Sequence, residues 1–528
     1  MERRFIQVCR LGVCGKKPLQ PNRFTVGDPI AISEAIVSNS RMTKEGPSKI
    51  AAFPCLIVAA YLLNQFADVA VPVWSLARPM VVALAGVVLV QIVTSRLVKS
   101  ERAGFITAAL ATAALGFPLV ALAFLAAVLL SLLRHIRRPG VGLSSVTGVL
   151  NVLTGIMLIL AIVRVILVGG LQSAARADGH GEPTGREPDI MFVMLDGYAR
   201  ADTLAEFGLD NGSFLAALEH RGFDVAERAR SNYVKTWLTL ASMLDARHIK
   251  DMSGLPSSDA PLASQLRALN TVFNEARSWD VLRSRGYDII ATDSAFPDLA
   301  LYTADRTVGS WPLNAFEMGL IRDSGLAEIF RLVPGLAPEQ HRARTRGQLT
   351  AAGRALLEDG KDGPTFVWAH VMSPHPPFVF DADGGPTDLT ACYPASCGFF
   401  AVTPSQLGLS DAEYRAAFAS QTAYLNELVL TTIDEVLRGA SSPPVIVIMS
   451  DHGTRYSEDD PAESFHSFLA VLTPGRARMF SEDAATVMVM ATILNSYLDA
   501  DLSVPDPDRL FMSDVDDALR LTEATPSR

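Results

Sequence analysis

The stretch Asp189-Ile-Met-Phe-Val-Met-Leu-Asp196-Gly197 decides the fold of this 528-residue sequence. A continuous apolar run of this length is typical of a strand in a parallel sheet that is buried on both faces. Two later runs repeat the pattern, Thr365-Phe-Val-Trp-Ala-His370 and Val445-Ile-Val-Ile-Met449. Helical patterns lie between them, for example over 212–221 and 411–437. Strands that alternate with helices predict an α/β domain with a mainly parallel sheet.

A polar cluster follows each of these three strands. Asp196 ends the first, His370 and His375 follow the second, and Asp451-His452-Gly453 follows the third. Because ligands of open α/β sheets bind at the carboxyl ends of the strands, we expect the clusters to meet in space. Each cluster alone has a plainer interpretation, namely a turn, a core histidine held by backbone, or a helix cap. Their joint occurrence favours a site where Asp196, Asp451 and His452 bind one divalent cation.

The sequence before residue 170 has the composition of a membrane domain. Its apolar runs cover 50–66, 80–93, 103–133 and 146–167. A span requires about 20 apolar residues, so the third run is long enough for two short spans, with a reversal at Gly116-Phe117-Pro118. Arg164, near the end of the last run, is expected to reach the membrane interface. We therefore predict about five α-helical spans over 50–170, followed by a linker over 171–187.

Basic residues set the predicted orientation of these spans. The N-terminal arm, the segment 96–102 and the segment 134–138 are all rich in Lys and Arg. If all three are cytoplasmic, five spans place the domain over 188–528 outside the cytoplasm. The alternative has four spans and a cytoplasmic large domain, but it places 134–138 on the wrong side of the membrane.

Charge is divided unevenly along the chain. Residues 1–170 carry a net charge of +11 and the whole chain carries −10, so the remainder carries −21. Such an acidic domain disfavours nucleic-acid phosphates, and we expect no nucleic-acid partner. Residues 1–49 are expected to form a cytoplasmic arm. Within it, 1–41 lack periodicity and a signal-peptide pattern, so they are interpreted as an extension upstream of a start at Met42 or as a disordered segment.

Cysteine usage is sparse. Cys392 and Cys397 are the only pair in the large domain, and the sequence leaves open whether they form a disulfide or stay as free thiols. A structural zinc site is not expected, since no CxxC pattern is repeated.

In order and spacing, the motifs resemble the alkaline phosphatase superfamily, in its sulfatase-like membrane branch. That branch includes lipid A phosphoethanolamine transferases and lipoteichoic acid synthases, which also carry about five spans before the catalytic domain. The resemblance runs from about residue 188 to 511. The matching positions are Asp196, Thr236-Trp-Leu-Thr239-Leu-Ala-Ser242, Ser373-Pro-His375-Pro-Pro-Phe378, Asp451-His452-Gly453 and His466. No single motif is specific, and the resemblance depends on their order and spacing.

The resemblance implies a metal site formed by Asp196, Thr236, Asp451 and His452, with Thr236 as the nucleophile. It also implies that His375 and His466 hydrogen-bond the nonbridging oxygens of the substrate, and that one of them protonates the leaving oxygen. The cofactor is expected to be one divalent ion, Zn²⁺ or Mn²⁺, or else Ca²⁺.

Local sequence selects the same nucleophile. Thr236 precedes the apolar run 238–244 and is expected to start a helix, where free N–H groups favour an anion. Thr239 and Ser242 lie inside the run, where a hydroxyl more often bonds the preceding turn. Lys235 is interpreted as a solvated helix residue, and Asn232 and Tyr233 as candidates to line the pocket.

Departures from the family pattern narrow the prediction. Val371 stands four residues before His375, where relatives with two metals carry Asp, so a second metal site is not expected. No C/S-x-P-x-R sequence surrounds Thr236, so a formylglycine sulfatase is not expected either. Asp196 replaces the Glu that is common in the phosphoethanolamine transferases, which leaves the identity of the metal open.

The predicted function is a sulfatase-like hydrolase or transferase that acts on phosphate or sulfate esters through a phospho- or sulfo-threonine intermediate. Its expected partner is a membrane lipid or an envelope glycan. Its expected location is the bacterial cytoplasmic (inner) membrane, as a multi-pass protein with an extracytoplasmic catalytic domain. The alternative is a catalytically inactive protein of the same fold that binds or senses a ligand. The presence of Thr236 and Asp451-His452 favours catalysis, but the sequence does not separate hydrolase from transferase.

Overall fold

The computed structural model describes residues 51–524 except for short internal segments. The segments left out are 69–72, 99, 138–142, 177–186, 295, 310–312, 323, 325–335, 359–362, 390–401, 457–461 and 515–516. The predictions for the N-terminal arm 1–49 and for Cys392 and Cys397 therefore lie outside the described residues, as does most of the predicted linker.

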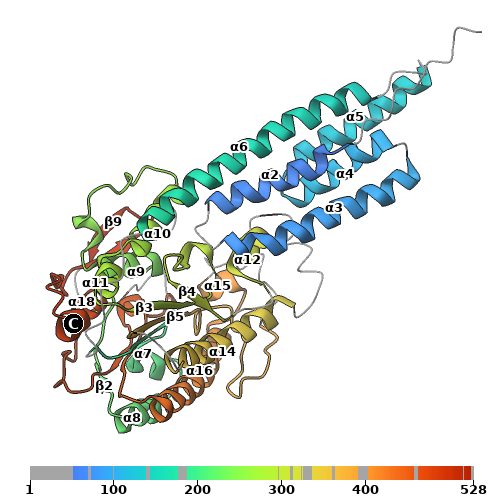
Figure 1. The fold of residues 1–528 in the computed structure, drawn as a ribbon. Coiled ribbons are helices and arrows are strands. Elements are labelled where there is room, and N and C mark those ends of the chain that lie inside the picture. The colour runs from blue at the N-terminus through green and yellow to red at the C-terminus, as the bar shows by residue number, and fades with distance from the viewer. Residues whose placement is uncertain are drawn as a thin grey trace, which may run out of the picture. The chain divides into compact units, whose positions relative to one another are not determined.

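The described residues of the N-terminal part form five helices, one for each half of the predicted hairpin and one for each other apolar run (Figure 1). They are α2 (Phe53–Asp68), α3 (Ala77–Leu97), α4 (Ser100–Ala114), α5 (Pro118–Arg137) and α6 (Ser144–Arg176), with a short 3₁₀ turn η1 (Val73–Leu76) before α3. The predicted reversal lies between α4 and α5. Gly116 adopts a φ of +86°, which an L-residue with a side chain rarely takes, and Pro118 begins α5.

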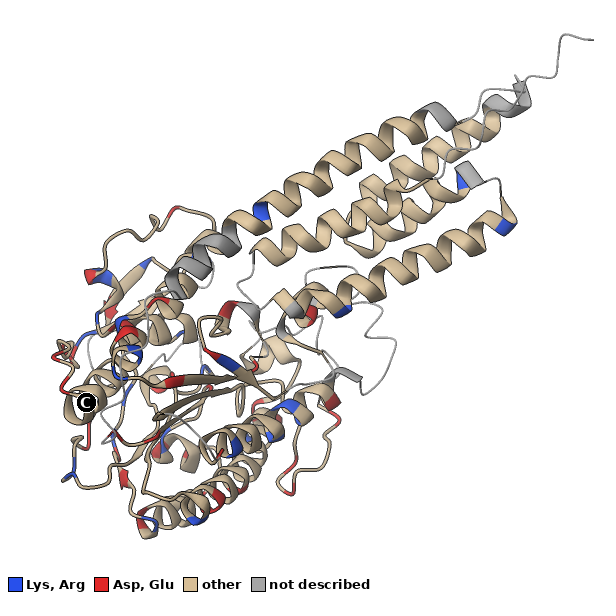
Figure 2. Ribbon diagram, viewed as in Figure 1, with Lys and Arg blue, Asp and Glu red and all other residues tan. Residues whose placement is uncertain are grey.

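These helices carry almost no charged side chains, in contrast to the domain that follows (Figure 2). Two of them, over Ala77–Leu97 and Val146–Leu167, are long and apolar enough to cross a membrane by length and composition. The helices over Phe53–Ala67, Arg102–Ala114 and Pro118–Leu133 are apolar but shorter. The number of spans thus stays a prediction.

Polar contacts join the helices to one another and to the domain that follows. Arg164 Nη1 donates to Asn64 Oδ1 on α2 at 3.2 Å, and the expectation that Arg164 reaches the membrane interface stays a prediction. Arg78 of α3 pairs with Glu317 of α12 (Ala315–Arg322), and the rings of Phe66 and Phe316 meet edge to face at 5.6 Å. Side chains of α12 thus contact the helices of the N-terminal part.

The large domain is built on a sheet of seven strands in the order β2-β7-β6-β1-β5-β3-β4. The strands are β1 (Ile190–Leu195), β2 (Asp224–Val225), β3 (Asp288–Thr292), β4 (Arg306–Val308), β5 (Thr365–Val371), β6 (Val445–Met449) and β7 (Leu469–Leu472). Neighbours pair in parallel except that β7 is antiparallel to β6 and β2. The predicted α/β domain with a mainly parallel sheet is therefore confirmed.

Helices cover both faces of this sheet, because successive side chains of β1 point to opposite faces. Besides α12, the helices in the described residues of the domain are α7 (Ala201–Glu206), α8 (Gly212–His220), α9 (Thr236–Asp245), α10 (Leu262–Asn274), α11 (Arg277–Ser284), α14 (Leu336–Leu356), α15 (Pro404–Leu407), α16 (Asp411–Gly439), α17 (Ala462–Phe465) and α18 (Thr486–Leu498). Ile190, Phe192 and Met194 pack with α9, α11 and α18, while Met191 and Val193 pack with α8, α14 and α16. The described part also contains the short 3₁₀ turns η2 (Ile249–Asp251) and η3 (Pro297–Leu299) and a hairpin of β8 (Leu510–Ser513) and β9 (Leu521–Ala524).

Candidate metal and active site

The register of the central strands brings two carboxylates to one edge of the sheet. Met194 of β1 lies opposite Met449 of β6, and an aspartate follows two residues after each of these methionines, namely Asp196 and Asp451. The order of strands also reverses here, since β3, β4 and β5 lie on one side of β1 while β6 and β7 lie on the other. Such a point is where open α/β sheets bind ligands.

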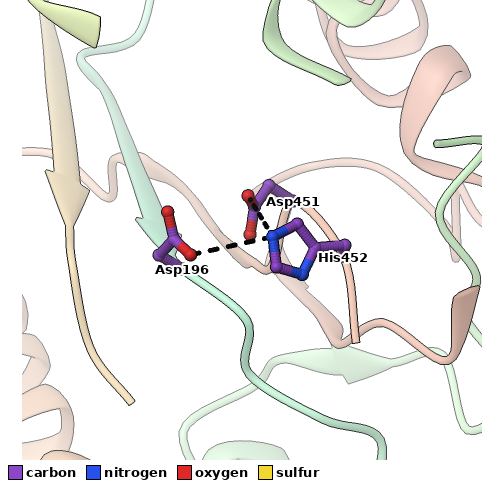
Figure 3. A group of neighbouring side chains, drawn as sticks. All are labelled: Asp196, Asp451 and His452. Carbon is purple, nitrogen blue, oxygen red and sulfur yellow. Dashed lines mark ion pairs between the residues drawn. The ribbon is translucent and has the colours of Figure 1, made fainter. Parts of the chain in front are cut away.

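Asp196, Asp451 and His452 form one compact cluster of candidate ligands (Figure 3). One ligand atom from each lies within 4.8 Å of the others, and all three residues are fully buried. His452 Nε2 lies 3.2 Å from Asp451 Oδ2 and 3.8 Å from Asp196 Oδ1. The structure thus brings together three of the four predicted ligands at the distances a shared cation requires.

The unpaired atoms of the cluster fit a cation. Asp196 Oδ1 and Asp451 Oδ2 are buried and have no hydrogen-bond partner, although a buried carboxylate oxygen without a partner is costly. His452 Nδ1 lies 2.7 Å from the Gly453 carbonyl and must donate to it, which leaves the Nε2 lone pair facing the two oxygens. Two carboxylate oxygens and one imidazole nitrogen are a donor set suited to Zn²⁺ or Mn²⁺.

Electrostatics supports the same conclusion. Burial, together with the neighbouring Asp196, raises the pKa of Asp451. Burial alone would also raise the pKa of Asp196, but the imidazoles of His375 and His370 outweigh it and the pKa lies below its usual range. Burial lowers the pKa of His452 to about 3, so its imidazole is neutral and able to bind a metal. A cation between these two adjacent buried carboxylates would offset their mutual repulsion.

Glycines on either side of the cluster permit its geometry. Gly197 adopts a φ of +67°, and its N–H donates to Asp451 Oδ1 at 2.9 Å, which ties the end of β1 to the loop after β6. A side chain on Gly453 would collide with the backbone carbonyls of Glu463 and His466. The glycine of the Asp-His-Gly motif is therefore required by close backbone packing.

Thr236 lies beside this cluster at the first residue of α9, as its sequence position predicts. Its Oγ1 is 3.3 Å from Asp196 Oδ2 and 3.5 Å from His452 Nε2. Its side chain is buried, and the unsatisfied N–H groups of the first turn add positive potential around it. The structure therefore brings the fourth predicted ligand to the other three.

The two competing hydroxyls have structural partners, although not those expected. Thr239 Oγ1 donates to the Asp451 carbonyl at 3.0 Å, and Ser242 Oγ donates to the Arg247 carbonyl at 2.6 Å. Both bonds join α9 to other segments, whereas bonds to the preceding turn of the helix were expected. Thr239 thus supports the loop that carries Asp451 and His452.

His375 is buried next to the cluster with both ring nitrogens engaged. Nδ1 lies 2.6 Å from the Pro376 carbonyl, and Arg455 Nη2 donates to Nε2 at 2.7 Å. Burial lowers the pKa of His375 to about 4. With a neutral ring whose Nε2 accepts, His375 is not a proton donor in this state. The other predicted role, a contact to substrate oxygens, stays a prediction.

His466 makes a different contact from the one implied. Its Nδ1 lies 3.3 Å from Thr203 Oγ1, at α7, and its backbone packs on Gly453. These contacts place the His466 segment against the Asp-His-Gly loop. They do not by themselves provide a ring nitrogen for substrate oxygens, so that role also stays a prediction.

Sequence reasoning gave His370 no role beyond that of a core histidine, and it did not identify Arg455. His370 Nε2 lies 3.2 Å from Asp196 Oδ2, so His370 supports a candidate ligand instead of being held by backbone. The rule that ligands bind at the carboxyl ends of parallel strands already predicted that His370 lies near Asp196, since His370 lies opposite Met194 in the register of β5 and β1. Arg455 was not singled out, although only Thr454 separates it from the Asp-His-Gly motif.

The interpretations of Lys235 and Asn232, near the nucleophile, were wrong, whereas the pocket-lining role of Tyr233 stays a prediction. Lys235 is not a solvated helix residue: it is the half-buried residue before α9, and burial lowers its pKa to about 8. Asn232 does not line the pocket, because its side chain bonds the carbonyls of Pro507 and Arg509. Tyr233 stacks on Phe511 with ring centroids 5.4 Å apart.

Neither the protein-family models nor the curated proteins match this chain. Among solved structures, it is similar to the C-terminal periplasmic domain of EcEptC from Escherichia coli, at 12% identity over 65% of this chain and 96% of that one, with a TM-score of 0.39.

Two further similar structures are the soluble domain of lipooligosaccharide phosphoethanolamine transferase A from Neisseria meningitidis and a protein of the alkaline phosphatase superfamily from Vibrio parahaemolyticus. The first is 12% identical over 62% of this chain and 96% of that one, with a TM-score of 0.36. The second is 11% identical over 66% and 81%, with a TM-score of 0.37. The Vibrio parahaemolyticus protein is described as a member of the alkaline phosphatase superfamily, and the Neisseria meningitidis protein as a phosphoethanolamine transferase. At such identities and TM-scores, activity has to be argued from the site itself.

Proposed function

We propose that this chain is a membrane-embedded, metal-dependent hydrolase or transferase of phosphate or sulfate esters, with Thr236 as its nucleophile. The observation that carries the proposal is that a buried hydroxyl lies beside the three buried candidate metal ligands Asp196, Asp451 and His452. Thr236 Oγ1 lies within 3.5 Å of both Asp196 Oδ2 and His452 Nε2. A purely structural role for Thr236 does not require two carboxylates and a neutral imidazole around its hydroxyl.

The residues of the site divide the chemistry between them. Asp196, Asp451, His452 and Thr236 would hold one divalent cation, which when bound favours the alkoxide form of the threonine. Thr236 Oγ1 then attacks the phosphorus or sulfur, and the bond to the leaving oxygen breaks. The group stays on Thr236 until water or an acceptor hydroxyl attacks it in turn. The burial of the cluster excludes bulk water and so strengthens each charge interaction.

The membrane location is part of the same proposal. The described helices α2–α6 are apolar, and many of their large side chains, such as Val81, Leu119 and Leu160, are exposed. An apolar surface of this extent fits a lipid environment. With five spans and a cytoplasmic N-terminus, the catalytic domain lies outside the cytoplasm and can reach a membrane lipid or an envelope glycan.

Thr236→Ala in the full-length, detergent-solubilised protein tests the nucleophile. The variant should lose cleavage of bis(4-nitrophenyl) phosphate and 4-nitrophenyl sulfate. Ser242→Ala is the matched control on the same helix, since Ser242 bonds Arg247 away from the cluster, and it should keep most of the activity. The wild-type activity should disappear with chelator and return with Zn²⁺ or Mn²⁺. Full activity of Thr236→Ala would show that the nucleophile is another group.

A further inference from the structure

One backbone carbonyl of the candidate metal site is held by two hydroxyl groups. The Asp451 carbonyl accepts a hydrogen bond from Thr239 Oγ1 at 3.0 Å and another from Ser231 Oγ at 2.6 Å. All three residues are buried, so bulk water does not replace a donor that is lost. Within the described residues, these two hydroxyls are the hydrogen-bond donors that the oxygen meets.

This carbonyl belongs to the peptide unit that joins two adjacent candidate ligands, Asp451 and His452. Because a peptide unit is planar, its orientation sets the positions from which both side chains extend. A rotation of this plane would move Asp451 Oδ2 and His452 Nε2 together, and these atoms lie 3.2 Å apart. The two hydroxyls thus hold the peptide that carries both ligands.

Both hydroxyls come from the segment that carries the candidate nucleophile. Thr239 lies one turn after Thr236 in α9, and positions i and i+3 share one face of a helix. Ser231 lies before Thr236, in the segment that leads into α9. Its Oγ also lies 2.6 Å from the Tyr233 carbonyl and accepts from the Tyr233 N–H at 3.2 Å. The nucleophile is therefore connected to the ligand pair from both sides along the chain.

Resting on the proposed function, we propose that Thr239 and Ser231 are positioning residues, whose hydroxyls align the nucleophile with the ligand pair. Thr236 Oγ1 lies 3.5 Å from His452 Nε2 in the structure, and attack on an ester requires that this alignment is kept. A displacement of about 1 Å in such a site costs up to about a hundredfold in rate. The two hydroxyls therefore act on the chemical step more than on substrate binding.

Thr239→Val tests this role in the full-length, metal-loaded protein. Valine keeps the branched shape of threonine and a similar helix propensity, so the change removes little besides the hydroxyl. For the ester that the wild type cleaves, we expect kcat to fall about tenfold to a hundredfold while KM changes by less than about threefold. In Co²⁺-loaded protein, the visible absorption spectrum reports the ligand geometry, and the variant should shift it. Thr239→Ser restores the hydroxyl and should recover most of the kcat and the wild-type spectrum.

The shared acceptor predicts a specific coupling between two variants. Thr239→Val and Ser231→Ala each leave the Asp451 carbonyl with one donor, whereas the double variant leaves this buried oxygen with none. A buried carbonyl without a partner costs more than the loss of one of two hydrogen bonds, so the peptide is expected to turn toward another donor and move both ligands. The loss of kcat in the double variant should therefore exceed the product of the two single losses by at least about threefold.

Ser278→Ala is the matched control. The Ser278 hydroxyl is also buried and donates to a carbonyl of α9, that of Leu244 at 2.5 Å, near the opposite end of the helix from Thr236. Its loss should lower the unfolding midpoint about as much as the loss of the Thr239 hydroxyl, but leave kcat and the Co²⁺ spectrum unchanged. An equal fall of kcat in Ser278→Ala would show that any weakening of α9 slows the reaction, and the positioning role would be rejected.

Two other outcomes would overturn the proposal. One is a Thr239→Val variant with the kcat and the Co²⁺ spectrum of the wild type, and the other is a Thr239→Ser variant that restores neither. If unfolding midpoints show that Thr239→Val is misfolded, Thr239→Ala and Ser231→Ala carry the same comparison. Failure of the proposed function is a separate result, because wild-type, metal-loaded protein then cleaves neither bis(4-nitrophenyl) phosphate nor 4-nitrophenyl sulfate. In that case, the Co²⁺ spectra and affinities of the same variants still decide whether the hydroxyls position the ligands.

Discussion

Asp451→Asn should change the stability of the large domain in opposite directions with and without metal. Without a cation, Asp196 and Asp451 are two fully buried carboxylates whose candidate ligand atoms lie within 4.8 Å of each other. At that distance and an effective dielectric constant of about 20, their repulsion amounts to about 3 kcal/mol. Because the pKa of Asp451 is raised in the folded state, this penalty is present at neutral pH and is relieved as the pH falls.

The amide fits the space of the carboxylate it replaces. Its oxygen keeps the bond from the Gly197 N–H, which is 2.9 Å long in the structure, and its NH₂ can donate to His452 Nε2, 3.2 Å from the present Oδ2. In chelator, the variant should therefore unfold at a temperature about 5 °C higher than the wild type. With saturating Zn²⁺, the wild type should gain about 4 kcal/mol at a concentration a thousandfold above Kd, and the variant should lose most of that gain.

Thermal unfolding followed by intrinsic fluorescence, with chelator and with Zn²⁺, measures both changes in the unfolding midpoint on the same samples. Asp434→Asn is a suitable control, since Asp434 is a surface partner of Arg221 and its effect should not depend on metal. If Asp451→Asn lowers the midpoint equally in both conditions, the two carboxylates do not repel each other in the metal-free protein, and the cation site has been misassigned.

Two further predictions concern the support of the site and its location. His370→Gln should weaken metal binding about tenfold to a hundredfold, because His370 orients Asp196 from 3.2 Å, and competition with a chromogenic chelator measures the affinity; an unchanged Kd would assign His370 a packing role only. A reporter active only outside the cytoplasm, fused after Arg528, should give signal, and a stably expressed but silent fusion would reject the five-span topology.

Local patterns were sufficient for the elements of the fold. The apolar runs around Phe192, Val367 and Val447 predicted β1, β5 and β6, and Gly116-Phe117-Pro118 predicted the turn between α4 and α5. These features depend on residues close in sequence, where side-chain period and backbone restrictions act directly. The start of α9 at Thr236 follows from the same kind of signal.

The site was predictable only as far as a general rule connects distant segments. Strand-end reasoning brought Asp196, Asp451 and His452 together, because parallel strands align their carboxyl ends. It could not decide the partners of Thr239, which bonds a carbonyl 212 residues away, or of Asn232, which bonds the C-terminal segment. Such contacts depend on how loops of no regular period close over the sheet.

The sequence by itself determined the α/β class, the apolar N-terminal helices, the order of the motifs and the residue types able to bind a cation. Tertiary structure alone decided which side chains surround the candidate cation site. It set His370 against Asp196 and Arg455 against His375, it turned His466 toward Thr203, and it left Lys235 half-buried. The reason is physical: burial and charge pairing arise from segments that lie far apart in the chain, so hydropathy and spacing contain no measure of them.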